Sequence, residues 1–291
     1  MGARDAPLPN AAGGLVWFGL PWGYRVSEAS SGLTDSTQRE GHGWWPYLGP
    51  YLAFMLAVEI AGRMPESSQG FMLFIKPLAP LLTILYHWRR GAYPELRGSS
   101  LSLSGAAQDV AVGLALTVLW VAPYLLFDNL RMGDPASPSL IPDMLRADTT
   151  NPFDPLMLGA EGVVVVLGAR MFGYALVTPL FEELFIRSFV MRYSEVYPGK
   201  GDFRDVPLAH YTARSLIATT VIFTIGHVPW EWWVAVPWVV LTSLWFYHRK
   251  NLWALILVHA VTNAALLLLA LYGGDLFSDG QGQPISLWFF V

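Results

Sequence analysis

Apolar stretches of membrane-spanning length recur along most of the chain, and no other feature limits its fold so strongly. Seven of them come near the ~20 residues that a helix needs to cross a bilayer. Only 14% of the 291 residues are charged, whereas about 25% is typical of a soluble domain. The sequence therefore predicts an all-α, polytopic transmembrane bundle of seven membrane helices. Their expected spans are about Trp44–Gly62, Phe71–Trp88, Val110–Phe127, Leu158–Met191, Leu216–Trp230, Trp232–Tyr247 and Leu252–Tyr272.

The fourth stretch, Leu158–Met191, is too long for a simple span. A straight helix of this length would measure ~50 Å, against ~30 Å for the hydrocarbon core of a bilayer. Arg170 interrupts the stretch, and Pro179 removes a backbone hydrogen bond and should kink the helix. We expect one long, kinked or tilted helix. A separate or re-entrant helix Leu158–Ala169 is the alternative, and it would raise the number of membrane helices to eight.

Composition and charge outline the domains and the orientation. Residues 1–43 are polar and form an N-terminal segment, and residues 44–291 form a single transmembrane domain that ends in a short aromatic, interfacial stretch, Ile285 to Val291. With seven spans, most Lys and Arg residues fall in segments on the same side of the membrane as the N-terminus. The loop Asp128–Asp154, on the other side, is acidic. The positive-inside rule then places the N-terminus in the cytoplasm. Without cysteine the chain has no thiol nucleophile or disulfide, and no basic run suggests nucleic acid.

Two carboxylates and a guanidinium lie inside one of the apolar runs, in Phe181-Glu182-Glu183-Leu184-Phe185-Ile186-Arg187. A charge at the centre of a bilayer costs at least ~2.5 kcal/mol, so such residues are taken as functional. Glu183 and Arg187 are four residues apart on a helix and should pair. Glu182 points about 100° away. We therefore expect Glu183 to be structural and Glu182 to be free for chemistry.

Two of the six histidines, His227 and His259, also lie within apolar runs, and Asn263 shares a helix face with His259. Helix rise places Glu182, His227, His259 and Asn263 within a turn or two of one depth. The sequence thus predicts a convergent site within the membrane. Because most of these depths are nearer the inner side, we expect a wet cavity whose mouth faces the cytoplasm.

This set of side chains suits hydrolysis. A carboxylate and an imidazole that share a water form a general base, a role for Glu182 with His227. A second imidazole and an amide supply donors to a tetrahedral oxyanion, a role for His259 with Asn263. Zinc held by Glu182, His227 and His259 is the alternative; the HExxH spacing is absent, and a metal-free mechanism without cofactor is favoured.

Other charged groups have structural interpretations. Glu59 and Arg63 are expected to pair with each other, and Glu231 is expected on the outer surface. Arg170 is expected to face Glu161 or a loop, or to bind an anionic group.

At these residues the sequence resembles the CPBP (Abi, CAAX-protease-like) family of intramembrane proteases. Three motifs carry the resemblance, in order Glu182-Glu183-xxx-Arg187, Phe223-xxx-His227 and His259-xxx-Asn263. The residues around these motifs are similar to a bacterial CAAX prenyl protease-related branch of the family. This similarity implies that the protein lies in a bacterial inner (plasma) membrane. The resemblance implies a catalytic core at residues 158–272, with Glu182, His227, His259 and Asn263 catalytic and Glu183, Arg187 and Phe223 supporting.

The resemblance implies a glutamate-type endopeptidase acting on a membrane-associated peptide or protein, with a CAAX-like C-terminal tail as one substrate and with membrane lipid around it. Three alternatives stay open. The same residues would serve a zinc-dependent protease, the fold would serve a non-catalytic binding or immunity protein, and Glu182 with the two histidines would serve as the proton relay of a transporter. A transporter would favour an inverted repeat, and the sequence shows no matching half.

Overall fold

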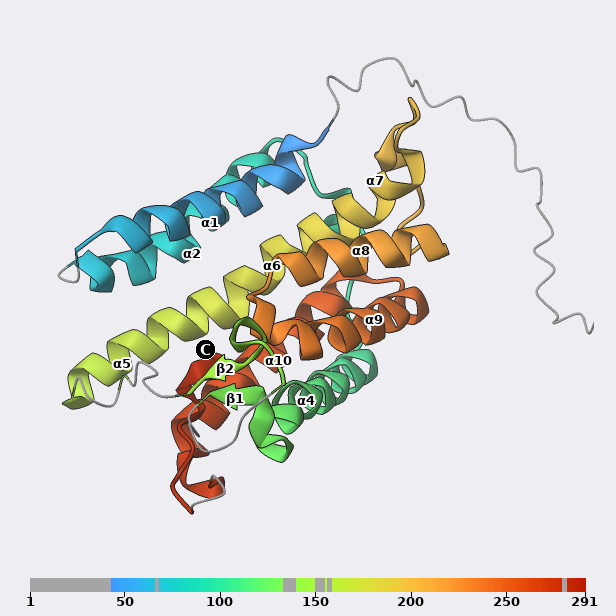
Figure 1. Ribbon diagram of the computed structural model, residues 1–291. Helices are drawn as coiled ribbons and strands as arrows, with labels where there is room; N and C mark the ends of the chain where they lie inside the picture. The colour runs from blue at the N-terminus through green and yellow to red at the C-terminus, as the bar shows by residue number, and fades with distance from the viewer. Residues whose placement is uncertain (1–42, 66–67, 133–139, 150–154, 156–158, 279–281) are drawn as a thin grey trace, which may run out of the picture. The chain divides into compact units, whose positions relative to one another are not determined.

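Helices account for nearly all of the regular structure (Figure 1). The computed structural model describes residues 43–65, 68–132, 140–149, 155, 159–278 and 282–291, so the predicted N-terminal segment lies almost wholly outside the described residues. The expectation of an all-α fold is confirmed, because the only strands among the described residues are the two-residue parallel pair β1 (Arg131–Met132) and β2 (Ala147–Asp148). The helices are α1 (Trp45–Arg63), α2 (Gln69–Arg89), α3 (Pro94–Arg97), α4 (Leu103–Leu126), α5 (Gly159–Arg170), α6 (Thr178–Glu183), α7 (Met191–Val196), α8 (Ala213–Ile225), α9 (Trp232–Arg249) and α10 (Leu252–Tyr272).

Four of the described helices are long and apolar enough to cross a membrane. They are Gly70–Arg89, Leu103–Leu126, Glu161–Val196 and Leu252–Tyr272, and Ala213–Ile225 is a shorter apolar helix. The described helices α1 and α9 occupy two of the other predicted spans without meeting these limits. The chain is thus a multi-pass membrane protein, and the total of seven spans stays a prediction.

The awkward fourth stretch is one continuous helix of 36 residues, Glu161–Val196, in which α5, α6 and α7 follow one another without a break. This confirms the expectation of a single long helix. Two π-helical segments, Met171–Val177 and Leu184–Val190, separate the three α-helical parts. Wider π turns inside an α-helix often occur at functional sites. Here they lie on both sides of α6, the six residues that end with Glu182 and Glu183.

Close helix packing surrounds this long helix. α1 and α2 form an antiparallel pair, which Figure 1 shows as two adjacent ribbons. α4 and α10 approach closely at Gly113, where an added Cβ would lie 2.8 Å from the carbonyl oxygen of Val258. Small residues at such crossings let helix backbones come together in membranes. An ion pair between Arg249 and the fully buried Asp109 joins α9 to α4 at 3.0 Å.

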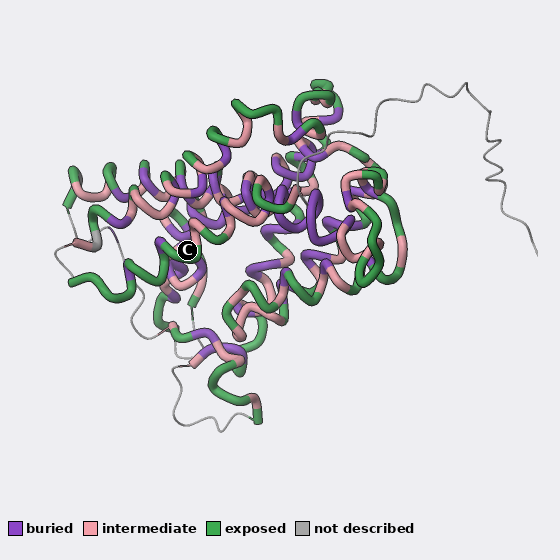
Figure 2. The backbone as a smooth tube through the Cα atoms, turned by 90° about the horizontal axis from the view of Figure 1, so that it is seen from above, coloured by how far each residue is buried: buried purple, intermediate pink, exposed green. Residues whose placement is uncertain are grey.

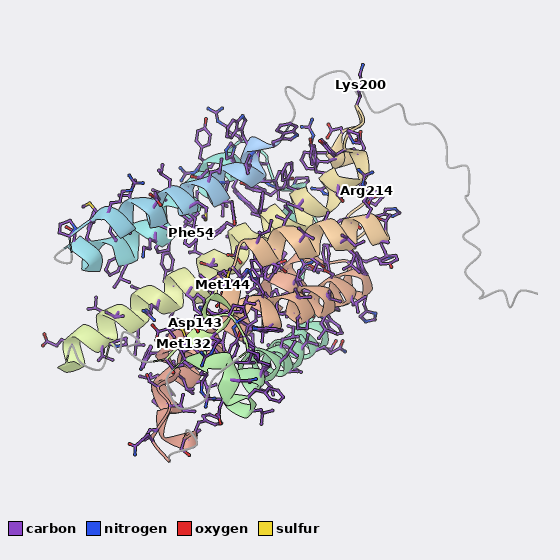
Figure 3. All side chains as sticks on the ribbon, viewed as in Figure 1. Phe54, Met132, Asp143, Met144, Lys200 and Arg214 are labelled. Carbon is purple, nitrogen blue, oxygen red and sulfur yellow. The ribbon has the colours of Figure 1, made fainter. Side chains whose placement is uncertain are left out.

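The connections gather at two ends of the bundle. Figure 3 shows Lys200 and Arg214 at one end, and Met132 and Asp143 at the other. We call the first the basic end and the second the strand end. At the basic end Trp253 Nε1 donates to the carbonyl oxygen of Leu96 at 2.9 Å. At the strand end Trp233 Nε1 donates to the carbonyl oxygen of Leu145 at 2.9 Å.

The most continuous burial runs along the centre of the bundle, where Figure 2 shows purple tube in the interior. Every residue of Leu184–Val190 is buried, including Arg187. Aromatic contacts close the space between α1 and the long helix, with the rings of Phe54 and Phe181 4.9 Å apart. In Figure 3 Phe54 points from α1 toward that helix. The residues next to Glu182 and Glu183 therefore sit in a tightly packed interior.

Candidate active site

A cavity of about 370 Å³ lies inside the bundle. Its walls come from α1, α4, the long helix, α8, the connection between α8 and α9, α9, α10 and the last described residues. Four side chains selected from the sequence line it together: Glu182, His227, His259 and Asn263. The structure therefore brings into one cavity the set that was expected to converge.

The lining of the cavity includes residues near one end of the bundle. Besides mid-helix positions, its lining includes Val228 and Glu231, which connect α8 to α9, and Phe289 to Val291, which follow α10. These residues lie toward the strand end. Among the described residues, none from the loop around Lys200 and Arg214 contributes to the lining. α8 ends earlier than its apolar run and carries His227 beyond its last turn, on the side of the strand end. That the mouth faces the cytoplasm stays a prediction.

Glu183 is bound on both sides by charged or polar groups. Its Oε2 accepts a hydrogen bond from Nε of Arg187 at 2.9 Å, and its Oε1 lies 2.9 Å from Nδ1 of His259. The side chains of Glu183 and Arg187 are 1% and 0% exposed. Arg187 also donates to Ser243 Oγ at 2.5 Å and to Thr242 Oγ1 at 2.8 Å. The predicted pairing of Glu183 with Arg187 is confirmed, and the contact with His259 adds a role that spacing alone did not predict.

Glu182 points to another side, as its position in the helix requires. Its Oε2 lies 3.8 Å from Nε2 of His259, and its side chain is 18% exposed, which is more than that of Glu183. His259 therefore stands between two carboxylates, with Nδ1 held by Glu183 and Nε2 directed toward Glu182. Since a carboxylate accepts from Nδ1–H, this arrangement sets the orientation of the ring.

His227 lies just beyond the C-terminus of α8, which ends at Ile225 and not near Trp230 as predicted. Gly226 and Pro229 follow, and both favour the end of a helix. The Nδ1 atom of His227 is 2.8 Å from the carbonyl oxygen of Phe223. A carbonyl oxygen only accepts, so Nδ1 carries the hydrogen and Nε2 keeps a lone pair. The ring of Phe223 also packs against that of His227 in a tilted arrangement, with the ring centres 4.3 Å apart.

Asn263 is held by the backbone of the long helix. Its Nδ2 donates to the carbonyl oxygen of Tyr174 at 2.8 Å. In the π-helical segment, the N–H of Thr178 bonds five residues back to Gly173. The next bond in this pattern would join residue 179 to Tyr174, but Pro179 has no N–H. The carbonyl group of Tyr174 is thereby left for Asn263. The backbone hydrogen bond that Pro179 removes is therefore the one to Tyr174, five residues back.

No group of three or more His, Asp or Glu side chains among the described residues is arranged to hold a metal ion. The alternative zinc ligands Glu182, His227 and His259 share the cavity without forming such a group. The indole N–H groups of Trp120 and Trp238, which also line the cavity, are buried without a partner among the described residues. They are further donors that a polar substrate group could use.

Sequence reasoning missed one acidic residue of the site. Glu231 was expected on the outer surface, but it is half-buried and lines the cavity. Burial raises the pKa of Glu231 to about 8, and the nearby charge of Glu182 adds to this rise. The available signal was its spacing, since Glu231 follows His227 by four residues.

The predicted pairing of Glu59 with Arg63 is confirmed. On the exposed face of α1, Nε of Arg63 donates to Oε1 of Glu59 at 2.8 Å.

The last described residues also differ from expectation. The aromatic stretch from Ile285 was predicted at the membrane interface, but Leu287, Trp288 and Phe290 are buried in the protein. Arg170 donates from Nη1 to the carbonyl oxygen of Val291 at 2.8 Å. This partner was outside the set considered for Arg170, because nothing in the sequence shows that residues 121 positions apart meet.

Comparison with known families agrees with the motifs. Residues 165–265 match the family model described as Type II CAAX prenyl endopeptidase Rce1-like. The match includes all three motifs, and this segment is therefore an Rce1-like domain of a peptide hydrolase family. The recognition made from the sequence is confirmed. No curated protein and no solved structure shows significant similarity to the chain.

The buried ion pair should matter far more for stability than its exposed counterpart. We expect Arg187→Met to lower the stability of the protein by ~3–5 kcal/mol, because it leaves Glu183 buried without its guanidinium. Arg63→Met, which breaks a pair of the same i,i+4 spacing at 79% and 61% side-chain exposure, should change it by less than ~1 kcal/mol. Denaturation in mixed detergent micelles measures both. Equal losses in the two variants would contradict the assignment.

The orientation predicted from charge can now be tested at the cavity. Val228 lines the cavity and is 48% exposed at the strand end, whereas Lys200 marks the basic end. If the basic end is cytoplasmic, a membrane-impermeant maleimide should label Val228→Cys only in right-side-out vesicles and Lys200→Cys only in inside-out vesicles. The chain has no other cysteine. The reverse pattern would show that the basic end faces outward.

Proposed function

Since residues 165–265 form an Rce1-like CAAX endopeptidase domain, we propose that this protein is an intramembrane endopeptidase. It hydrolyses a peptide bond of a membrane-associated substrate, and a CAAX-like tail is one candidate. The observation that carries this proposal is the pair Glu182 and His259, 3.8 Å apart in the cavity, with the far nitrogen of His259 held by Glu183. A base and an electrophilic donor then face the same space.

Glu182 is the general base. It removes a proton from a water molecule as the oxygen attacks the carbonyl carbon of the scissile bond. The carbonyl π electrons move to oxygen and form an oxyanion. When the tetrahedral intermediate collapses, the C–N bond breaks and the proton held by Glu182 passes to the leaving amine. The products are a carboxylic acid and an amine, and Glu182 is regenerated.

His259 and Asn263 stabilise the oxyanion. In this role both ring nitrogens of His259 carry hydrogen, so that Nδ1–H donates to Glu183 and Nε2–H is a donor on the cavity side. The second N–H of the Asn263 amide is available because only one is used by Tyr174. His227 assists from the opposite wall: its Nδ1 is occupied by Phe223, so Nε2 can accept a hydrogen bond from the attacking water.

The zinc-dependent alternative uses the same Glu182, His227 and His259. It requires these three groups to close around one ion, whereas the described residues contain no group of three His, Asp or Glu side chains arranged to hold one. We therefore favour a base that acts on water directly.

The base assignment predicts a selective loss. Glu182→Gln should reduce turnover of a fluorogenic farnesylated CAAX peptide to background while the protein still folds, because the amide keeps the shape and loses the proton acceptor. His227→Ala, His259→Ala and Asn263→Ala should each lower kcat by ~10² or more. Glu161→Gln, on the exposed face of α5, is the matched control and should keep full activity. Near-normal turnover by Glu182→Gln would refute the mechanism.

Glu231 should shape the pH profile. Because its pKa is raised to about 8, Glu231 is neutral below that pH and becomes a second carboxylate in the cavity above it. The groups near it are Glu182, Tyr124 and Tyr174, each electrostatically coupled to it, and His227 on the same wall. A second negative charge opposes the oxyanion, so kcat/KM should fall above about pH 8. Glu231→Gln should extend activity to higher pH, and an unchanged alkaline limb in this variant would disprove the role.

A further inference from the structure

One wall of the cavity is covered by a short stretch of the chain itself. Residues 287–291 follow α10 and run into the cavity, where Phe289, Phe290 and Val291 are part of the lining. Leu287 is fully buried, and its Cδ1 packs so closely on Gly273 that a Cβ there would lie 3.2 Å away. Phe290 is also buried, with its ring 5.6 Å from that of Tyr124. We call residues 287–291 the inserted segment.

The long helix binds the backbone of the inserted segment, not only its side chains. Arg170 Nη1 donates to the carbonyl oxygen of Val291 at 2.8 Å, and the hydroxyl group of Tyr174 donates to that of Phe290 at 3.5 Å. The guanidinium of Arg170 also lies 5.8 Å from the ring centre of Trp288. Two successive carbonyl groups are thus matched by donors from two residues one turn apart on the same helix.

One of these donors, Tyr174, lies on the same cavity wall as the candidate base. Tyr174, Thr178 and Glu182 follow one another at four-residue spacing, and all three line the cavity. Tyr174 also connects the two sites directly, because its carbonyl oxygen binds Asn263 while its hydroxyl group binds Phe290. Tyr174 alone therefore separates the backbone of the inserted segment from Asn263, a proposed oxyanion donor.

Peptides in a membrane cavity need such donors. Any peptide that enters brings carbonyl groups that lipid cannot satisfy, and burying such a group without a partner is unfavourable. The wall formed by Arg170 and Tyr174 supplies partners for two of them, and the aromatic surface of Tyr124 and Trp230 accommodates large apolar side chains. The chemistry of the inserted segment, Leu-Trp-Phe-Phe-Val, shows what this wall accepts.

We infer that Arg170 and Tyr174 form a peptide-binding subsite for the substrate of the proposed endopeptidase, and that the inserted segment occupies this subsite until substrate displaces it. The subsite takes a stretch of large apolar residues, with a carbonyl or carboxylate group at Arg170. This rests on the proposed function for the identity of the ligand as a substrate. Occupation by residues 287–291 is a property of the chain that can be measured separately.

Occupancy is tested by chemical labelling, which needs no catalytic activity. In the cysteine-free chain of 291 residues, Thr178→Cys places one thiol in the cavity between Tyr174 and Glu182. Leu287→Asp should release the inserted segment, because it puts a charge at a fully buried position. The rate of alkylation by a small maleimide in detergent should then rise about 10-fold or more, as expected if the closed state is favoured by at least that ratio.

Leu276→Asp, at a position that is 70% exposed, is the matched control and should leave the labelling rate unchanged. If Leu287→Asp does not fold, Phe290→Ala serves as the releasing variant, with a folded fraction checked by thermal unfolding. An unchanged rate in a folded releasing variant would overturn the occupancy.

The subsite is tested by kinetics in the released background. With the farnesylated CAAX peptide, Leu287→Asp should lower KM, because substrate no longer competes with the inserted segment. Adding Arg170→Gln should raise KM again by about 10-fold with little change in kcat. This is the effect of losing a contact that binds the substrate and the transition state equally. A loss confined to kcat would refute a binding role for Arg170. If no variant cleaves the peptide, the proposed function fails with that substrate, while the labelling result still decides occupancy.

Discussion

A carboxylate buried beside a guanidinium organises the centre of this protein. Glu183 and Arg187 are both shielded from solvent, and each would be costly alone in such surroundings. Their pairing lets the long helix carry charge into the interior, and Arg187 fixes α9 to it through Thr242 and Ser243. The other oxygen of Glu183 reaches α10 at His259. One i,i+4 pair thus joins three helices, and the geometry of the candidate site depends on it.

The same interaction separates the roles of two neighbouring carboxylates. Both carboxylate oxygens of Glu183 contact protein partners, Arg187 and His259. Glu182 is turned toward the cavity, and its Oε2 lies 3.8 Å from Nε2 of His259. A base needs a free lone pair near the reacting water, and an orienting group needs a fixed partner. Helical geometry, with 100° between successive residues, supplies both from one dipeptide.

Departures from regular α-helix place the remaining groups. The π-helical turn before α6 and the missing N–H of Pro179 leave the carbonyl oxygen of Tyr174 for Asn263. The end of α8 at Ile225 puts His227 in a turn, where its ring bonds back to Phe223. In a membrane interior every backbone group needs a partner. Each of these irregularities is matched by a side chain that satisfies the group it exposes.

Periodicity and residue chemistry were sufficient for the all-α fold, the long helix, the Glu183–Arg187 pair and the set Glu182, His227, His259 and Asn263. These follow from local rules, because i,i+4 spacing and the cost of charge in lipid act within one helix. Only the tertiary structure decided that Glu183 binds His259, that Glu231 lines the cavity, and that Phe289 to Val291 line it too. These contacts join residues far apart in the chain, and they depend on where each helix ends and how closely its neighbours approach, which no local pattern in the sequence specifies.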